Sequence, residues 1–183
     1  YEISECLVGS EMCIRDRGNS TTTPRDLEND LDVWIIQIAL AESVAARLRK
    51  HGFKCKTVEI TVRDNRLYSF SRQIHLRQPT NITNEIVTAA FQLFKDNYKW
   101  EHPIRSLGIR AADLVLDDIP VQLDLFGNQE KKEKLEKLDR TVDEIRRRFG
   151  YFSIQRAAMY QDKVLSHLDA GTHTVHPHSY FHG

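Results

Sequence analysis

The chain has 183 residues, of which 40% are hydrophobic and 28% charged, enough for one sizeable core and a polar extension. Lys plus Arg equals Asp plus Glu at 26 each, which excludes a strongly basic or acidic protein and means that any basic surface must be local. The three cysteines include no Cys-x-x-Cys pair, and no apolar run approaches the roughly 20 residues of a membrane span, so we expect a cytoplasmic protein without disulfides, zinc or a membrane anchor.

Residues 1–17 show no period of a strand or a helix. The stretch from Cys6 to Arg17 resembles the translated adapter sequence that contaminates some assembled reads, while the alternative is an ordinary disordered N-terminus. Under either interpretation we expect a leader, ending at residue 17, that contributes neither structure nor function.

A small, hydroxylated stretch runs from Gly18 to Thr23. Serine and threonine hydroxyls often contact phosphates, but a threonine run is also an ordinary edge strand, and the residues alone favour neither. The carboxylates between residues 26 and 32 suit a helix N-terminus, where they meet the positive end of the dipole. We therefore expect a helix over residues 31–50, with one apolar face, cations in its last turn and Gly52 as its end.

Two alternating runs follow, over residues 56–62 and 67–76, and the turn Asp64-Asn65 joins them into a β-hairpin. The polar side of the first run carries Thr57, Glu59, Thr61 and Arg63. The polar side of the second run is expected to offer hydroxyls, an amide and Arg72, although any half-exposed strand alternates in this way. A second helix begins near Thr83 and ends near Trp100, with caps expected from the residues at 80–83.

The last strand of this region begins at Ile104, where Leu107 and Ile109 alternate with Ser106, Gly108 and Arg110. One face of this strand is apolar, and the other offers a hydroxyl, bare backbone and a cation, which suits phosphates. The order is strand, helix, strand, strand, helix, strand. It predicts an α+β fold, βαββαβ, whose antiparallel sheet carries both helices on one face and leaves the other face open. The open face is expected to hold Thr57, Thr61, Ser71, Ser106 and Arg110.

Three stretches together resemble the little-finger domain of Y-family translesion DNA polymerases, of the DinB/UmuC branch of bacteria. They are Gly18 to Asp26, Phe70 to Gln73, and Pro103 to Arg110, in the family's order and with the right elements between them. The resemblance implies a sheet laid against the major groove of primer-template DNA, with phosphates contacted irrespective of sequence. The DNA contacts that it implies are Ser20, Thr21, Thr22, Thr57, Thr61, Ser71, Arg72, Arg105, Ser106 and Arg110.

The same resemblance places the family's catalytic palm, with its metal-binding carboxylates, N-terminal to Gly18. We therefore expect a fragment that does not polymerise DNA and needs no cofactor, since Mg²⁺ would belong to the palm of the parent enzyme. An enzyme acting alone is the weakest alternative, because the sequence shows no nucleophile–base pair, carboxylate cluster or phosphate loop.

Residues 119–128 contain a pentapeptide, Gln122-Leu123-Asp124-Leu125-Phe126, that is more apolar than a linker requires. It resembles the sliding-clamp-binding motif in the tails of these polymerases, whose Gln bonds to the clamp rim while Leu and Phe fill an apolar pocket. The alternative is that Leu123, Leu125 and Phe126 pack back on the domain.

Residues 129–183 form the tail. A helix ending at Gly150 carries a heptad-like stripe of Leu135, Leu138, Val142, Ile145 and Phe149. This helix could dock on the domain, self-associate or lie along DNA, and we expect it to be solvated. Five histidines follow, at positions 167, 173, 176, 178 and 182, and their spacing fits a disordered terminus better than a metal site.

These features predict a DNA-binding and clamp-tethering fragment for damage bypass and DNA repair, with its sheet domain at residues 18–118. The competing hypothesis is a free-standing ferredoxin-like module that binds RNA or protein. RNA-binding sheets stack bases on exposed aromatic side chains, whereas Tyr68 and Phe70 are expected on the core side.

Overall fold

The computed structural model describes residues 16–118 and 129–166. The pentapeptide, the first 15 residues and the five terminal histidines lie outside these ranges. The first described range confirms the expected order of elements. These are β1 (Asp16–Leu27), α1 (Asp30–Lys50), β2 (Phe53–Asp64), β3 (Ser69–Thr80), α2 (Thr83–Asn97) and β4 (Ile104–Leu116).

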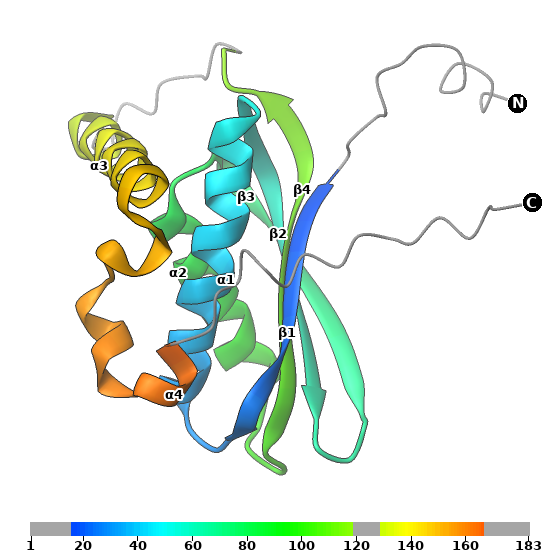
Figure 1. The fold of residues 1–183 in the computed structure, drawn as a ribbon. Coiled ribbons are helices and arrows are strands. Elements are labelled where there is room, and N and C mark those ends of the chain that lie inside the picture. Colours follow the sequence, from blue (N-terminus) through cyan, green and yellow to red (C-terminus); the bar gives the residue numbers. More distant parts are fainter. Residues whose placement is uncertain (1–15, 119–128, 167–183) are drawn as a thin grey trace, which may run out of the picture.

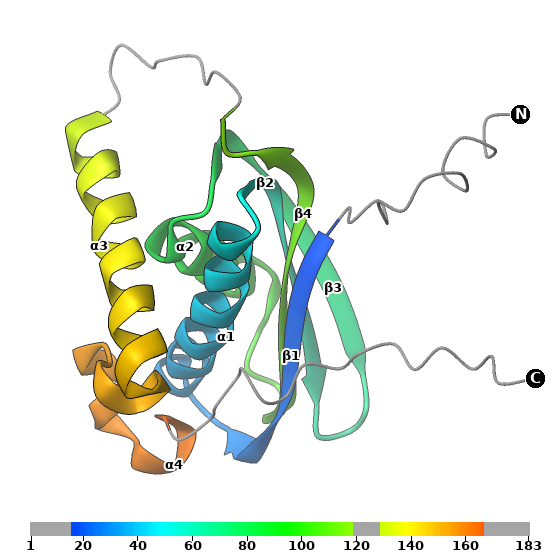
Figure 2. The ribbon, with the colours of Figure 1, turned by 45° about the horizontal axis from the view of Figure 1, so that its top comes forward.

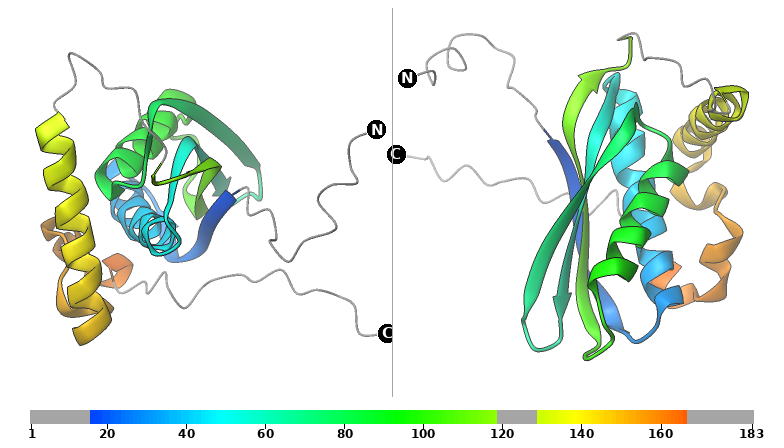
Figure 3. Two further views of the ribbon diagram at one scale, coloured as in Figure 1. Left: turned by 90° about the horizontal axis from the view of Figure 1, so that it is seen from above. Right: turned by 180° about the vertical axis from the view of Figure 1, so that it is seen from behind.

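The four strands form one sheet in the order β1-β4-β2-β3, and all three pairings are antiparallel. Helices α1 and α2 cover the same face of this sheet, and the opposite face is open (Figure 1). The view from behind shows the same two layers (Figure 3). The predicted α+β fold is therefore confirmed. Strand β1 begins at Asp16, two residues inside the expected leader, because Asp16 and Arg17 pair with Ala112 and Ala111 of β4.

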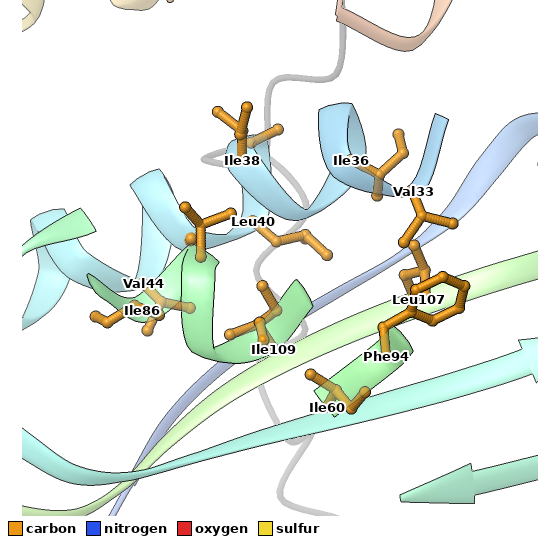
Figure 4. Packing of buried hydrophobic residues seen from close by; sticks show 14 of the residues in the cluster. Val33, Ile36, Ile38, Leu40, Val44, Ile60, Ile86, Phe94, Leu107 and Ile109 are labelled. Atoms are coloured by element: carbon orange, nitrogen blue, oxygen red, sulfur yellow. The ribbon is translucent and has the colours of Figure 1, made fainter. Parts of the chain in front are cut away.

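Helix α1 is the centre of the core. Its N-cap is Asn29, whose side chain accepts a hydrogen bond from the N–H of Asp32, and its last turn carries three cations that match the helix dipole. Buried residues occur on all sides of α1 rather than on one stripe, as expected of a helix between other layers. Figure 4 shows Leu40 and Val44 among side chains from the sheet and α2, including Ile109. Gly52 follows at a positive φ of 69°.

The second described range folds onto the outer side of the helices. It contains α3 (Gln129–Phe149), η1 (Tyr151–Ser153), η2 (Ala157–Gln161) and α4 (Lys163–Ser166). Helix α3 lies beside α1 and α2 on the side away from the sheet (Figures 2 and 3). Met159 and Leu165 are 1% and 0% exposed and belong to the main core. None of the helices in the described ranges is long and apolar enough to cross a membrane.

The expectation of a solvated C-terminal helix is wrong. The predicted apolar stripe coincides only in part with the docked side of α3. Leu135, Val142 and Ile145 are partly buried, whereas Leu138 is 54% exposed and Phe149 is 74% exposed. The residue buried on this helix is Asp139, at 6% exposure. Helix α3 therefore docks with part of its stripe and with charged side chains, which Arg49 and Glu42 of α1 complement.

Candidate nucleic-acid interface

The open face is built from rows of residues that lie opposite one another across all four strands. In the central row, Thr61 of β2 pairs with Ser71 of β3 and with Gly108 of β4, and Gly108 pairs with Ser20 of β1. Directly opposed residues point to the same face of a sheet, so three hydroxyls and one bare backbone position stand in line. Ser20, Thr61 and Ser71 are all exposed.

Two further rows flank the central row. One contains Ser69, Arg63, Ser106 and Thr22, and the other contains Gln73, Glu59, Arg110 and Gly18. The face therefore combines hydroxyls with two arginines. These are the groups that contact phosphate oxygens in protein–DNA interfaces.

Gly108 lies at the bottom of a depression of about 210 Å³. A Cβ at this position would come within 3.1 Å of the Ser20 Cβ and 3.6 Å of the Thr61 Cβ, so the missing side chain leaves the backbone open between two hydroxyls. A glycine inside a strand often marks such a site of close approach. The depression is lined by Gly18, Asn19, Ser20, Thr61, Gly108, Ile109 and Arg110.

Arg110 stands at the rim of this depression between two carboxylates. Its Nε lies 2.8 Å from Asp16 and its Nη1 lies 3.3 Å from Glu59, which also accepts a hydrogen bond from the Ser71 hydroxyl. The side chain of Arg110 is 50% exposed. Ion pairs at this exposure contribute little to stability, so a phosphate can replace a carboxylate at the guanidinium at small cost.

Arg63 is a cation of this face that was absent from the expected DNA contacts. It is exposed, pairs with Ser106 and Ser69 in the sheet, and has no ion-pair partner among residues 16–118 and 129–166. The alternation of the strand places Arg63 on the same side as Thr57 and Thr61, and this signal could have identified it from the sequence.

Two of the expected contacts lie on the opposite, helix-covered side of the sheet. Thr21 pairs with the buried Leu107, and Arg72 pairs with the buried Ile60. The Arg72 Nε reaches Asn97 of α2 at 3.3 Å, so its guanidinium lies at the helix side of the edge strand. Adjacent residues of a strand point to opposite faces, and these two positions have the wrong parity for the open face.

Two other expected contacts are not available in these rows. Thr57 has the right parity but is 4% exposed, and its hydroxyl donates to Asp113 at 2.5 Å. Arg105 lies where the β1–β4 register is irregular, and it pairs with Asp26 at 3.3 Å. Of the expected set, the structure brings together Ser20, Thr22, Thr61, Ser71, Ser106 and Arg110.

Aromatic side chains are missing from the three rows described above. Phe70 packs partly buried against the core, as expected, but Tyr68 does not. Tyr68 is 67% exposed in the turn between β2 and β3, because the strand begins only at Ser69. The rows thus offer no platform for the base stacking that RNA-binding sheets use. In the described ranges, no cluster of three or more His, Cys, Asp or Glu could hold a metal ion.

Comparison with known proteins identifies the family of the chain. The family described as the impB/mucB/samB family C-terminal domain matches residues 16–125. The chain therefore belongs to this family. It is the C-terminal, little-finger region of a Y-family DNA polymerase of the DinB/UmuC branch.

The relatives are bacterial polymerases. DNA polymerase IV of Acetivibrio thermocellus is 43% identical over 158 residues, covering 86% of this chain and 40% of that protein. DNA polymerase IV 2 of Bacillus subtilis is 35% identical over 145 residues, covering 77% of this chain and 34% of that protein. The chain thus spans about two fifths or less of the length of these relatives.

A solved structure also resembles the fold. It is a complex of beta-clamp processivity factor and little finger domain of PolIV, and the similarity has a TM-score of 0.47 with 14% identity. The match covers 61% of this chain and 99% of that chain.

Proposed function

We propose that this region holds a translesion polymerase on primer-template DNA and tethers it to a sliding clamp, without itself performing catalysis. The observation that carries the DNA-binding half is the central row, in which Ser20 and Thr61 flank the open backbone of Gly108 and Ser71 extends the row beyond Thr61. The row crosses the full width of the sheet. A surface of this kind suits a DNA backbone, which presents phosphates at regular intervals.

The open face favours binding that ignores the base sequence. Hydroxyls and arginines that contact phosphates fix the position of a protein on DNA but carry no sequence information. The net charge of the chain is zero, so attraction to DNA depends on the local cations Arg63 and Arg110 rather than on the whole molecule. We therefore infer weak binding that falls steeply with salt.

Titration of a labelled duplex at several salt concentrations tests this half of the proposal. Replacing Arg63 and Arg110 together by Ala should lower the affinity and reduce the slope of log affinity against log salt by about 2, since each lost phosphate contact contributes about 0.9. Arg72→Ala is the matched control, because this arginine is also exposed but points to the helix side. Equal losses for Arg72→Ala and for the double variant would show that the open face is not the binding surface.

The clamp-tethering half rests on the pentapeptide at residues 122–126, which follows the end of β4 at Leu116. We propose that Gln122 orients this segment on the clamp, that Leu123, Leu125 and Phe126 fill an apolar pocket, and that Asp124 stays at the surface. No cofactor takes part in either contact, so a chelator should leave both affinities unchanged.

A further inference from the structure

Charged groups fasten helix α3 to the layer of α1 and α2. Arg49 of α1 binds two carboxylates of α3, with its Nε 2.6 Å from Asp143 and its Nη1 3.2 Å from Asp139. The side chains of Arg49 and Asp139 are only 6% and 8% exposed. These groups have therefore given up most of their hydration to form the contact.

A second cluster, with the charges reversed, lies along the same interface. Glu42 of α1 is 6% exposed and receives Arg146 and Arg156, each at 3.0 Å. The hydroxyl of Tyr151 donates to the same carboxylate at 3.1 Å, and Arg146 lies 4.5 Å above the Tyr151 ring. Helix α3 is thus held at one point by a cation of α1 and at the other by an anion of α1.

The segment after α3 combines such polar contacts with apolar burial. Met159 and Leu165 are buried in the main core, and Asp162 forms an ion pair with Arg25 at 2.7 Å. Apolar burial does not weaken with ionic strength as ion pairs do. Gly150, at a φ of 93°, separates the charged contact of α3 from this apolar anchor.

The interface between α3 and the domain is also loosely packed. A cavity of about 160 Å³ lies between them, and its lining includes Glu42, Arg49, Asp139 and Arg146. The Nε2 of Gln155, another lining residue, is buried without a hydrogen-bond partner in the described part of the chain. This space is partly open to the surface, so the contact between α3 and the domain is not closely packed throughout.

A third cluster ties the end of β4 to α3. The Nζ of Lys54 lies 2.7 Å from Asp117 and 3.4 Å from Glu136, and Arg140 lies 2.9 Å from the same Asp117. Burial disfavours the charge of Lys54, but Asp117 and Glu136 outweigh it and raise the pKa of the amine. Ion pairs thus hold the residues on either side of 119–128, the end of β4 and helix α3, next to each other and to β2.

We propose that α3 is a strap latched by charge, which holds both flanks of the proposed clamp-binding segment against the domain and releases the C-terminal flank when the latch opens. This inference rests on the proposed function for the role of that segment, but not for the latch itself. When the latch opens, α3 moves about Gly150, while Met159 and Leu165 stay buried in the main core. Because docking exchanges hydration for ion pairs, salt shifts the balance between the docked and the released state.

Hydrogen exchange on the complete chain tests the latch directly. Between about 0.05 M and about 1 M NaCl, exchange of the α3 amides and of the Thr83 amide, which bonds to Asp139, should quicken about tenfold or more. Amides of α1 and β2 should keep their protection. Unchanged α3 exchange over this range, or equal acceleration throughout the core, would overturn the proposal.

A variant repeats the test without a change of salt. Arg49→Gln at low salt should accelerate α3 exchange by about tenfold or more, because Asp139 and Asp143 lose their buried cation. Arg147→Gln is the control, since it removes an arginine of α3 whose ion pair with Glu144 is exposed. Similar exchange in the two variants would contradict the latch.

Binding to a bacterial sliding clamp separates the strap from the proposed function. In the complete chain, Arg49→Gln should change the affinity for the clamp. The free peptide of residues 119–129 contains no part of the latch, so its affinity for the clamp at low salt serves as the reference. Loss of peptide binding with intact salt-dependent exchange would reject the clamp contact and keep the latch. Peptide binding with salt-independent exchange would reject the latch and keep the clamp contact.

Discussion

The carboxylate of Asp139 on α3 accepts a hydrogen bond from the backbone N–H of Thr83 at 2.7 Å, and so caps a helix to which it does not belong. The N-cap position of α2 is Ile82, which has no side chain for this task. The residues before it supply only part of the expected cap, since Thr80 accepts from the N–H of Ile82 at 3.1 Å. The first turn of α2 therefore depends on the docked tail.

Replacing Asp139 by Ala should lower the free energy of unfolding by about 3 kcal/mol, because the change removes the cap of α2 and leaves Arg49 with one carboxylate fewer. Urea unfolding followed by circular dichroism measures the effect. Glu144→Ala removes a carboxylate from the exposed side of the same helix and should change stability by less than about 0.5 kcal/mol. Equal effects of the two changes would contradict the role of Asp139.

Two neighbouring residues of α4 should respond very differently to truncation. Leu165 is 0% exposed within the main core, so Leu165→Ala should cost about 2–5 kcal/mol of stability. Val164 is 58% exposed, and Val164→Ala should cost less than about 0.5 kcal/mol. Thermal or urea unfolding compares them. A small effect of Leu165→Ala would mean that α4 is not part of the folded core.

Gly108→Ala places a methyl group in the depression of the open face, within 3.1 Å of the Ser20 Cβ. We expect about tenfold weaker binding to duplex DNA, since a methyl group between the two hydroxyls keeps a phosphate from the backbone. The stability cost should stay within about 1 kcal/mol, because the neighbouring side chain has to move by only a few tenths of an ångström. Fluorescence anisotropy with DNA, paired with a thermal melt, separates the two effects. Unchanged affinity would exclude the depression as a phosphate site.

The ion pair between Arg25 and Asp162 should make stability depend on pH. The hydrogen bond from Arg25, with backbone N–H donors of Leu165 and Val164, lowers the pKa of Asp162 below its ordinary value. A carboxyl group whose pKa is lower in the folded state stabilises the protein above the unfolded pKa of about 4, and this contribution is lost as the pH falls through the folded pKa.

Asp162→Asn should therefore reduce stability at neutral pH, and its difference from the unmodified chain should shrink as the pH falls below about 4. Urea midpoints measured across this range give the comparison. The asparagine can still accept from the backbone N–H groups, so the variant isolates the charge. A constant difference at all pH values would assign the effect to packing instead.

A peptide of residues 119–129 should bind a bacterial sliding clamp without the sheet domain. Full burial of a Leu or Phe side chain contributes about 1.5–3 kcal/mol, so Leu125→Ala with Phe126→Ala should abolish detectable binding. Calorimetry with both peptides is the measurement. The same two changes in the complete chain should leave DNA binding intact. A double variant that binds as well as the original would return the segment to an apolar patch that packs on the domain.

The order of the elements and most of the hydroxyls of the open face could be predicted from the sequence alone. Strands with a period of 2 and helices with a period of 3.6 are local properties, which explains why the last strand was expected to begin at Ile104, where β4 does begin. The alternation also carries the parity of Arg72, which stands between Ser71 and Gln73 and so falls with Phe70 and Ile74. The expectation that placed Arg72 on the polar side of this strand, together with Ser71, therefore conflicts with the alternation, and the structure pairs Arg72 with the buried Ile60.

Only the tertiary structure decided which side of α3 is buried. Its apolar stripe favoured five residues equally, yet Leu138 and Phe149 are exposed, the other three are only partly buried, and Asp139 is covered. The partner of Asp139 and Asp143 is Arg49, which lies 90 and 94 positions away in the chain. A charged side chain is buried where an opposite charge compensates its lost hydration, and this pairing depends on the folded positions of two distant elements. No periodicity within a single helix contains this information.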